Sequence, residues 1–474
     1  MKKCHLAVDI GASSGRLMAG WLEETATSGS VMKLEEIYRF TNGMIKKNNQ
    51  LIWDMDHLYS SIIAGIKESV NKGFKAVSLG IDTWAVDFVL LDEDDNLLTD
   101  AVAYRDSRTD GVMEEVFKTV SKEDIYERTG IQFQPFNTLY QLVALKQSNP
   151  AVLHKAASFL MIPDYLNYLL TGVKTNEYTN ATSTQFVNVQ SNKWDEELLE
   201  KLDIPTDMFH DIQLPGTILG ALRPEVAEEV GTQLDVVLPA THDTGSAVVA
   251  VPENKETIYL SSGTWSLLGI ETTEPIASEK ALSYNFTNEG GMDYRYRFLK
   301  NIMGLWMIQE VRRLMDDRYS FAEYVTLAQE AKEFSSVVDV NDNRFLNPDN
   351  MIEEVKAYCK ETQQPVPETP GEIARTIFLS LAKSYSKTIK EIEQLKHVTY
   401  DQINIIGGGT KNELLNELLA EESGKTVVTG PVEATAIGNI VVQMIVEEDL
   451  KDLKEARDVI RQSFDIKDYR PKGE

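Results

Sequence analysis

The sequence has little cysteine and no long apolar run. Its two cysteines, Cys4 and Cys359, lie far apart, so we expect free thiols in a reducing compartment rather than a disulfide or a metal site. No stretch approaches the roughly 18 apolar residues of a membrane-spanning helix, so none is expected. Asp9 interrupts the apolar run near the N-terminus, which argues against a secretory leader. The expected location is the cytoplasm.

Positive charge is also scarce, because 47 Lys and Arg stand against 74 Asp and Glu and the formal net charge is −27. A body this acidic repels nucleic acid and anionic membranes, so neither is an expected partner. The six histidines show no metal-ligand spacing, and no obligate protein partner is evident. A bound polyphosphate would therefore need local help from a cation, an arginine or main-chain donors.

The 474 residues, of which 42% are hydrophobic, fit two domains with large cores. Alternating strands and helices predict an α/β fold with mixed or parallel sheets covered on both faces. The second half repeats the plan of the first, and the border is expected between residues 242 and 256. We expect strands at 5–10, 17–22, 35–40, 76–81, 86–91, 236–240, 257–261, 265–271, 402–406 and 425–429, helices at 57–72, 122–129, 137–147, 151–170, 300–316, 321–333, 351–361, 371–395, 412–422 and 433–446, and an irregular segment at 174–186.

Two turns rich in Gly, Ser and Thr, at 9–16 and 261–264, each lie between apolar strands. Such turns expose backbone N–H groups and hydroxyls that suit phosphate oxygens. The first also carries Asp9, which could hold hydrated Mg²⁺, and Arg16, which could grip phosphate. It is not a Walker A loop, because no Lys follows its last Gly. A plain hairpin with a glycine turn is the alternative for the first turn.

A third glycine-rich turn, at 407–409, follows a predicted strand and is expected to open a helix. A Rossmann fingerprint would need a third spaced glycine, but position 412 is Asn. The turn could let a nucleotide approach the backbone closely, or it could be a simple tight connection between a strand and a helix.

Asp243 is the strongest candidate for a catalytic group. The predicted strand before it ends at Ala240, and small residues follow at 245–247. This places Asp243 on a loop at the end of a sheet, where α/β proteins bind ligands. A carboxylate there can accept a proton from a substrate hydroxyl. The alternative is an Asp that caps the next helix, and the neighbouring His242 is more often structural than a ligand.

Aromatic and hydrogen-bonding side chains alternate around Asp82, Trp84, residues 104–106 and Trp265. Sugars are commonly bound by such mixtures, although core packing is the usual role of a Trp. Asn301 is expected at the start of a helix, with Gln309 about two turns later.

Together and in this order, the motifs resemble those of the FGGY carbohydrate kinases, within the actin and sugar-kinase superfamily. The resemblance covers about residues 5–445 and implies two ribonuclease-H-like α/β domains with an interdomain cleft. Residues 1–245 would bind the sugar and carry the first phosphate loop, and residues 246–474 would bind the nucleotide. The segments that carry it are 8–20, 80–92, 103–109, 130–142, 161–172, 177–185, 241–248, 259–267, 287–291, 299–306, 347–351, 405–412 and 430–439.

The resemblance also implies roles for individual residues. Asp243 would be the general base. Ala85 stands where some relatives have glycine, so its contact with the sugar would be through the backbone. The implied ATP contacts are Ala12, Ser13, Ser14, Gly15, Arg16, Thr264, Gln309 and Gly408, and the implied sugar contacts are Asp82, Ala85, His242, Asp243, Thr244 and Asn301.

The activity implied by the resemblance is transfer of a phosphoryl group from ATP, with Mg²⁺, to O1 of L-rhamnulose. Another ketose or polyol, such as L-fuculose or xylulose, is the alternative within the family. An actin-like ATPase switch that binds a protein is the alternative of another class, because its phosphate hairpins would look similar.

Overall fold

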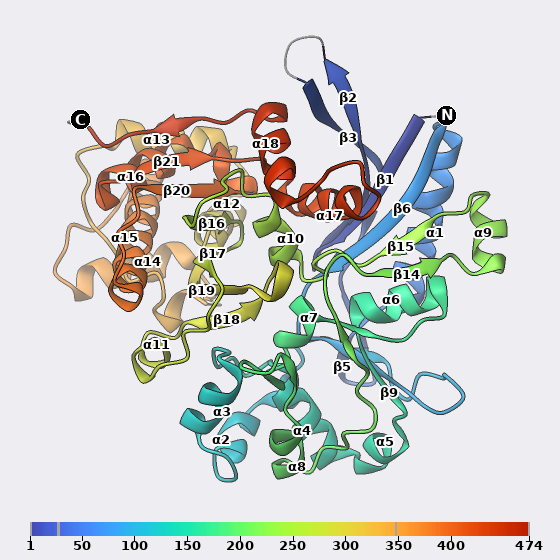
Figure 1. Cartoon of the computed structure of the whole chain (residues 1–474). Helices are drawn as coiled ribbons and strands as arrows, with labels where there is room; N and C mark the ends of the chain where they lie inside the picture. The colour runs from blue at the N-terminus through green and yellow to red at the C-terminus, as the bar shows by residue number, and fades with distance from the viewer. Residues whose placement is uncertain (1, 26–28, 347, 473–474) are drawn as a thin grey trace. The chain divides into compact units, whose positions relative to one another are not determined.

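Figure 1 shows the computed structural model of the chain, which describes residues 2–25, 29–346 and 348–472. The chain forms two compact units, each built from several stretches of sequence. Unit 1 consists of residues 1–250, 271–298 and 434–463, and unit 2 of residues 251–270, 299–433 and 464–474. Two late segments thus pack in the first unit, whereas the functional division at 245/246 stays a prediction.

Unit 1 is organised around a sheet with the strand order β14-β15-β6-β1-β2-β3. Strand β1 pairs in parallel with β6 and antiparallel with β2, and β2 pairs antiparallel with β3, so the first three predicted strands form an antiparallel meander. The elements of this unit are β1 (Lys2–Ile10), β2 (Ser14–Thr25), β3 (Gly29–Thr41), β4 (Met44–Lys47), β5 (Gln50–Trp53), α1 (Met55–Asn71), β6 (Phe74–Thr83), β7 (Phe88–Leu91), β8 (Ala101–Val102), α2 (Val112–Val116), α3 (Lys122–Thr129), α4 (Thr138–Ser148), α5 (Pro150–Lys155), β9 (Ser158–Met161), α6 (Ile162–Thr171), β10 (Asn176–Glu177), α7 (Tyr178–Thr182), β11 (Val187–Asn188), β12 (Lys193–Trp194), α8 (Glu196–Lys201), β13 (Ile212–Gln213), β14 (Ile218–Ala221), α9 (Pro224–Val230), β15 (Asp235–Val237), α10 (Asp243–Val249), α11 (Glu279–Ser283), β18 (Thr287–Gly290), α17 (Ala434–Val446) and α18 (Leu453–Ser463).

The strands of unit 2 follow the order β22-β21-β20-β16-β17-β19, which repeats the plan of the first sheet. Here β16 pairs in parallel with β20 and antiparallel with β17, as β1 does with β6 and β2. Its elements are β16 (Ile258–Ser262), β17 (Trp265–Thr272), β19 (Tyr296–Met303), α12 (Trp306–Leu314), α13 (Phe321–Glu330), α14 (Met351–Glu361), α15 (Pro370–Lys396), β20 (Gln402–Ile406), α16 (Glu413–Ser423), β21 (Thr426–Thr429) and β22 (Asp468–Tyr469), with β17 and β19 crossing the unit boundaries.

Strand alternation gives the central sheet of unit 1 two different faces. On one face Leu6, Val8 and Ile10 of β1 join a buried apolar cluster with Leu58 and Ile62 of α1. Helix α1 begins after Asp54, whose side chain accepts a hydrogen bond from the His57 N–H. The opposite face packs against α17, which lies beside β1 and β6 in Figure 1.

Two predicted helices are wrong in part. The expected helix at 151–170 is divided into α5, strand β9 and α6, because the apolar run of β9 pairs with β7. Periodicity cannot distinguish such a short buried strand from a helical segment. The expected helix at 300–316 begins only at Trp306, so Asn301 lies in strand β19 and caps no helix.

The irregular segment also differs from expectation, whereas a helix follows the glycine turn as predicted. Gly408 and Gly409 belong to a short 3₁₀ turn, Gly408–Lys411, that leads into α16. The segment 174–186 contains β10 and α7, and its polar residues Thr179 and Asn180 are fully buried. Polar composition predicted an irregular segment, whereas hydrogen bonds such as the one from the Thr179 hydroxyl to Glu177 at 2.6 Å hold part of it in the interior.

The contact between α10 and α17 requires glycine at position 438. A Cβ atom there would lie 1.7 Å from the backbone oxygen of Ser246. We expect Gly438→Ala to lower the free energy of unfolding by about 3 kcal/mol or more, because backbone must move to admit the methyl group. Urea denaturation measures the change. Gly43→Ala is the control, since a Cβ atom at Gly43 meets nothing within 4 Å; equal stability of the two variants would contradict the expectation.

Candidate active site

Acidic side chains gather where neighbouring parallel strands of unit 1 end. Asp9 of β1 is directly opposite Asp82 of β6 in the strand register. The Thr83 N–H donates to the Thr241 carbonyl at 2.8 Å, and Thr83 forms a parallel bridge with His242. Asp243 therefore follows at the same edge of the sheet, where the sequence predicts it.

The surroundings of Asp82 disfavour the ionised form of its carboxyl group. Burial raises the pKa of its carboxyl well above the usual range, and the charges of Asp9 and Asp243 raise it further. Asn439 Nδ2 donates to Asp82 Oδ2 at 2.7 Å, which partly offsets this. Within the described part of the chain, Asp82 Oδ1 has no hydrogen-bond partner. This oxygen is buried and polar, and a bound ligand or cation could satisfy it.

The Asp243 carboxylate is held at the start of α10. Its Oδ1 accepts from the Thr244 N–H at 2.6 Å and from the Thr244 hydroxyl at 3.1 Å. The N-cap of α10 is His242, so Asp243 is not the helix cap that the alternative interpretation required. The side chain is 35% exposed. A fixed and accessible carboxylate of this kind can take up a proton from a bound hydroxyl.

His242 lies between Asp243 and a buried ion pair. Its Nε2 is 3.4 Å from Asp243 Oδ1, and its Nδ1 is 3.3 Å from Glu289 Oε2 and 3.1 Å from Arg297 Nη2. Burial raises the pKa of Glu289, but the charge of Arg297 and the contact with His242 outweigh it, so the pKa is lowered. Neither Glu289 nor Arg297 was predicted from the sequence, although Glu289 lies in segment 287–291, which carries the family resemblance.

Glu177 fixes the backbone immediately before the candidate base. Its Oε2 accepts from the Thr241 N–H at 3.1 Å and from the Thr241 hydroxyl at 2.6 Å. The hydroxyl of Thr179 donates to the same oxygen at 2.6 Å and accepts from the His242 N–H at 3.2 Å. These residues were also missed, because their segment was expected to be irregular. The available signal was that Glu177 and Thr179 lie in segment 177–185, which carries the family resemblance.

The loop after Asp82 is strained and firmly held. Val86 has φ +68°, which is rare for a β-branched residue and is typical of functional sites. Its carbonyl accepts from the Thr138 hydroxyl at 2.6 Å. Trp84 is only 7% exposed, so it is a core residue as the alternative predicted. Ala85 is partly exposed in this loop, and its predicted backbone contact with a sugar stays a prediction.

Asp87 is a buried acceptor for several donors around this loop. Its Oδ2 accepts from Trp53 Nε1 at 2.6 Å and Trp84 Nε1 at 3.0 Å, and its Oδ1 accepts from Gln141 Nε2 at 3.1 Å. The two indole rings lie 4.1 Å apart. Burial outweighs these hydrogen bonds and raises the pKa of Asp87 to about 6.

The first of the two glycine-rich hairpins, with its turn at 9–16, presents Ala12 and Ser13 at an exposed tip. The turn is closed by the Gly11 N–H, which donates to the Ser14 carbonyl at 2.9 Å. Gly15 is required, because a Cβ atom there would lie 2.1 Å from the ring of Phe40. This hairpin therefore has the open backbone that the sequence predicts.

Arg16 and Asp9 of this hairpin form an ion pair. Arg16 Nη2 and Nε lie 2.9 and 3.1 Å from Asp9 Oδ2, and both side chains are mostly buried. The two residues that the sequence assigned separately to phosphate and Mg²⁺ thus act on each other. The pair holds the guanidinium at the strand end beside the turn.

In unit 2, the predicted nucleotide residues come together around the second hairpin. The Thr264 hydroxyl donates to Gln309 Oε1 at 3.4 Å. Gly304 lets the start of α12 approach, since a Cβ atom there would lie 2.7 Å from the carbonyl oxygens of Gly263 and Thr264. Gly409, next to Gly408, leaves no room for a side chain, because a Cβ atom would lie 1.9 Å from Ser262 Oγ.

Asn301 is placed differently from these residues. It is partly buried on β19, which neighbours β17 in the sheet, and it lies upstream of Gly304 and α12. Its predicted contact with a sugar stays a prediction.

Among the described residues, no group of three His, Cys, Asp or Glu side chains is arranged to hold a metal ion, and no helix has the length and apolar character needed to cross a membrane.

Two family models match nearly the whole chain. The N-terminal domain model of the FGGY family of carbohydrate kinases matches residues 4–250, and the C-terminal domain model matches residues 258–446. The chain belongs to the FGGY family of carbohydrate kinases. It is therefore a sugar phosphotransferase with the two-domain, mixed α/β sugar-kinase fold, and the resemblance noted in the sequence is confirmed.

Curated relatives and solved structures agree with this assignment. The chain is 59% identical over 469 residues to a protein of Oceanobacillus iheyensis named rhamnulokinase, with 99% of this chain and 98% of that one covered. It is 45% identical to the rhamnulokinase of Bacillus subtilis, with 99% and 95% covered. A ligand-bound xylulose kinase from Lactobacillus acidophilus has the same fold, with a TM-score of 0.78, 18% identity, and 99% and 94% of the chains covered.

The buried Asp87 carboxyl should make stability depend on pH. Its pKa is about 6 in the fold against 3.8 ordinarily, so between these values the folded chain binds a proton that the unfolded chain has lost. This bound proton stabilises the fold by about 3 kcal/mol. The stabilisation is complete below pH 4 and is lost as the pH rises through 6. We expect the difference in free energy of unfolding between wild type and Asp87→Asn to shrink by about 3 kcal/mol from pH 4 to just above pH 6. Urea denaturation at each pH measures it. A difference independent of pH would refute it.

Proposed function

We propose that this enzyme transfers the γ-phosphoryl group of ATP to O1 of L-rhamnulose, giving ADP and L-rhamnulose 1-phosphate. Full-length similarity to curated rhamnulokinases, up to 59% identity among those compared, is the observation that carries the choice of substrate. The strand-end carboxylates of unit 1 and the open turns of both units supply the chemistry that this reaction requires.

Asp243 is the general base in this proposal. The sugar O1 hydroxyl attacks the γ-phosphorus, its proton passes to the Asp243 carboxylate, the O1–P bond forms, and the bond from phosphorus to the β,γ-bridging oxygen breaks to release ADP. The Thr244 donors hold the carboxylate at 2.6 and 3.1 Å, so it needs little reorganisation before it accepts the proton. His242, Thr244, Asp82, Ala85 and Asn301 are assigned to the sugar.

The nucleotide arrives as the magnesium complex of ATP. No ready three-ligand metal site exists among the described residues, and Asp9 is already paired with Arg16. Asp9 fits Mg²⁺ through water better than as a direct ligand, because water-mediated contact leaves the ion pair intact. Bound magnesium would neutralise charge on the phosphates. Residues 12–16 are assigned to the phosphates, and Thr264, Gln309 and Gly408 to other contacts with the nucleotide.

The alternatives make different demands on the residues. An L-fuculose or xylulose kinase would use the same base and differ only in sugar contacts. An actin-like ATPase switch would have no use for Asp82, His242 and Asp243 gathered at the strand ends. The family assignment favours the kinase.

Asp243→Asn tests the assigned base. The amide keeps the size of the side chain but cannot take up the proton, so we expect kcat to fall about 10²–10⁴-fold with little change in KM for ATP. A coupled assay of ADP release measures both constants, and circular dichroism checks the fold. Turnover near that of wild type in a folded variant would exclude Asp243 as the base.

A panel of ketoses tests the substrate. We expect kcat/KM for L-rhamnulose to exceed that for L-fuculose and xylulose by at least about tenfold, because the hydroxyl groups of the wrong sugars leave buried polar groups unpaired. ADP release without any ketose serves as the control. Preference for another ketose would change the substrate, and fast hydrolysis of ATP that no ketose affects would favour the ATPase switch.

A further inference from the structure

A continuous chain of hydrogen bonds leads from Asp82 through the interior of unit 1. Asn439 Nδ2 donates to Asp82 Oδ2 at 2.7 Å, and Gln443 Nε2 donates to Asn439 Oδ1 at 2.7 Å. The Ser78 hydroxyl lies 2.7 Å from Gln443 Oε1 and 2.7 Å from His5 Nδ1. These side chains come from β1, β6 and α17 and belong to one packed interface.

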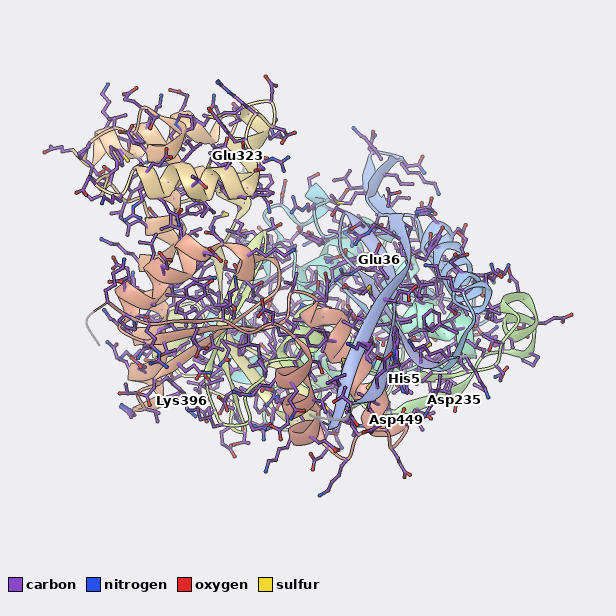
Figure 2. All side chains as sticks on the ribbon, turned by 90° about the horizontal axis from the view of Figure 1, so that it is seen from above. His5, Glu36, Asp235, Glu323, Lys396 and Asp449 are labelled. Carbon is purple, nitrogen blue, oxygen red and sulfur yellow. The ribbon has the colours of Figure 1, made fainter. Side chains whose placement is uncertain are left out.

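The chain reaches the surface at its other end. His5 Nε2 is 2.7 Å from Asp449 Oδ2, and Lys3 Nζ donates to both oxygens of Asp449 at 2.7 and 2.9 Å. The His5 side chain is 2% exposed, whereas those of Asp449 and Lys3 are 28% and 52% exposed. Figure 2 shows His5 and Asp449 next to each other.

The directions of these hydrogen bonds are fixed by groups that can only accept. Asn439 Nδ2 also donates to the Gly80 carbonyl at 3.2 Å, and Gln443 Nε2 also donates to the Leu6 carbonyl at 2.9 Å. Backbone carbonyls have no hydrogen to give, so neither amide can be turned round without losing these bonds. Gln443 Oε1 is therefore an acceptor, and the Ser78 hydroxyl must donate to it.

Both ring nitrogens of His5 must consequently carry a hydrogen. Ser78 has one hydroxyl hydrogen, which goes to Gln443, so the contact between Ser78 and His5 requires His5 Nδ1–H. Lys3 Nζ can only donate, and it contacts both oxygens of Asp449, so the carboxylate accepts a second hydrogen from His5 Nε2. His5 satisfies both neighbours only as an imidazolium.

Few other groups face this imidazolium. The residue opposite His5 on β2 is Gly20, and the facing side chains of β6 and α17 are the neutral Ser78 and Gln443. Asp449 supplies the counter-charge, with Lys3 on its outer side. A neutral His5 would leave one of its two contacts without a hydrogen.

Asp82 depends on this chain for its orientation. Asn439 is the side chain that donates to Asp82 Oδ2, while Asp82 Oδ1 has no partner among the described residues. The fit is also tight, because a Cβ atom at Gly80 would lie 2.5 Å from Asn439 Oδ1 and 3.0 Å from Gln443 Nε2. The bonds and the close packing together leave the Asn439 amide one orientation.

We propose that Asn439, Gln443, Ser78 and His5 are positioning residues that hold the Asp82 carboxylate for the sugar, with His5 as a buried imidazolium. The proposal rests on the proposed function for the role of Asp82, but the protonation of His5 can be tested without any substrate. The hydrogen-bond chain keeps Oδ2 occupied and turns Oδ1 into the oxygen that remains for a ligand.

The first test is spectroscopic and uses the wild-type protein. Long-range ¹H–¹⁵N correlation of protein labelled with ¹⁵N-histidine, at neutral pH, distinguishes protonated from bare ring nitrogens. His5→Gln identifies the His5 signals by their loss. We expect both His5 nitrogens at protonated positions. A bare nitrogen on His5 would overturn the proposal, whatever the substrate of the enzyme is.

The second test interrupts the chain in its middle. Ser78→Ala removes one hydroxyl far from the reacting groups and leaves Gln443 and His5 each lacking a partner. We expect kcat for the best ketose to fall about tenfold, with KM for ATP changed less than about twofold, because Gln443 Oε1 loses its donor and the amide chain that orients Asp82 is held less firmly.

Ser69→Ala is the matched control. Ser69 is equally buried in unit 1, and its hydroxyl donates to the Ile66 carbonyl within α1 at 2.7 Å. Both variants are assayed at a temperature where circular dichroism shows them folded. A loss of kcat in Ser78→Ala but not in Ser69→Ala supports the proposal, and equal kcat values overturn it. Failure of wild type on every ketose would count against the proposed function instead.

Discussion

The parallel pairing of β1 with β6 is the interaction on which the site of unit 1 depends. Its register puts Asp9 beside Asp82, and the bond from Thr83 to the Thr241 carbonyl continues that edge to Asp243. Strand pairing and burial of the apolar face against α1 hold the acids together, although their charges repel one another. The raised pKa of Asp82 is the direct result of this arrangement.

Polar groups in the interior keep the strand ends in place. Glu177 holds the backbone of Thr241, Asp87 gathers donors around the strained loop at Val86, and Asn439 holds Asp82. Each is a buried acceptor or donor with defined partners, and such groups favour one conformation over its alternatives because an unpaired buried group is costly. An active site at the end of a sheet lies outside the regular ladder of hydrogen bonds, so side chains must replace it.

The two units repeat one strand order but carry different chemistry. In unit 1 Asp9 lies opposite Asp82 one residue before the ends of β1 and β6, whereas the corresponding edge of unit 2 has Ser261 opposite Ile406. The second hairpin instead packs closely against the turns at Gly304 and Gly409. The repeat thus supplies two similar turns, of which one lies among acids and the other among glycines and hydroxyls.

The sequence alone determined the family, the repeated α/β plan, the two open hairpins and the place of Asp243 at a strand end, because these depend on local patterns of apolar residues, glycines and motif order. The tertiary structure decided that 158–161 is a strand, that Asn301 lies in β19, and that Glu177, Glu289 and Arg297 surround the residues before Asp243. The spacing in the sequence puts Ser78, Gly80 and Asp82 on one face of a strand. It likewise puts Asn439 and Gln443 on one face of a helix. Only the packing of α17 on β1 and β6 could join them, because contacts between residues more than 350 positions apart, such as Asn439 with Asp82, leave no local signal in a single chain.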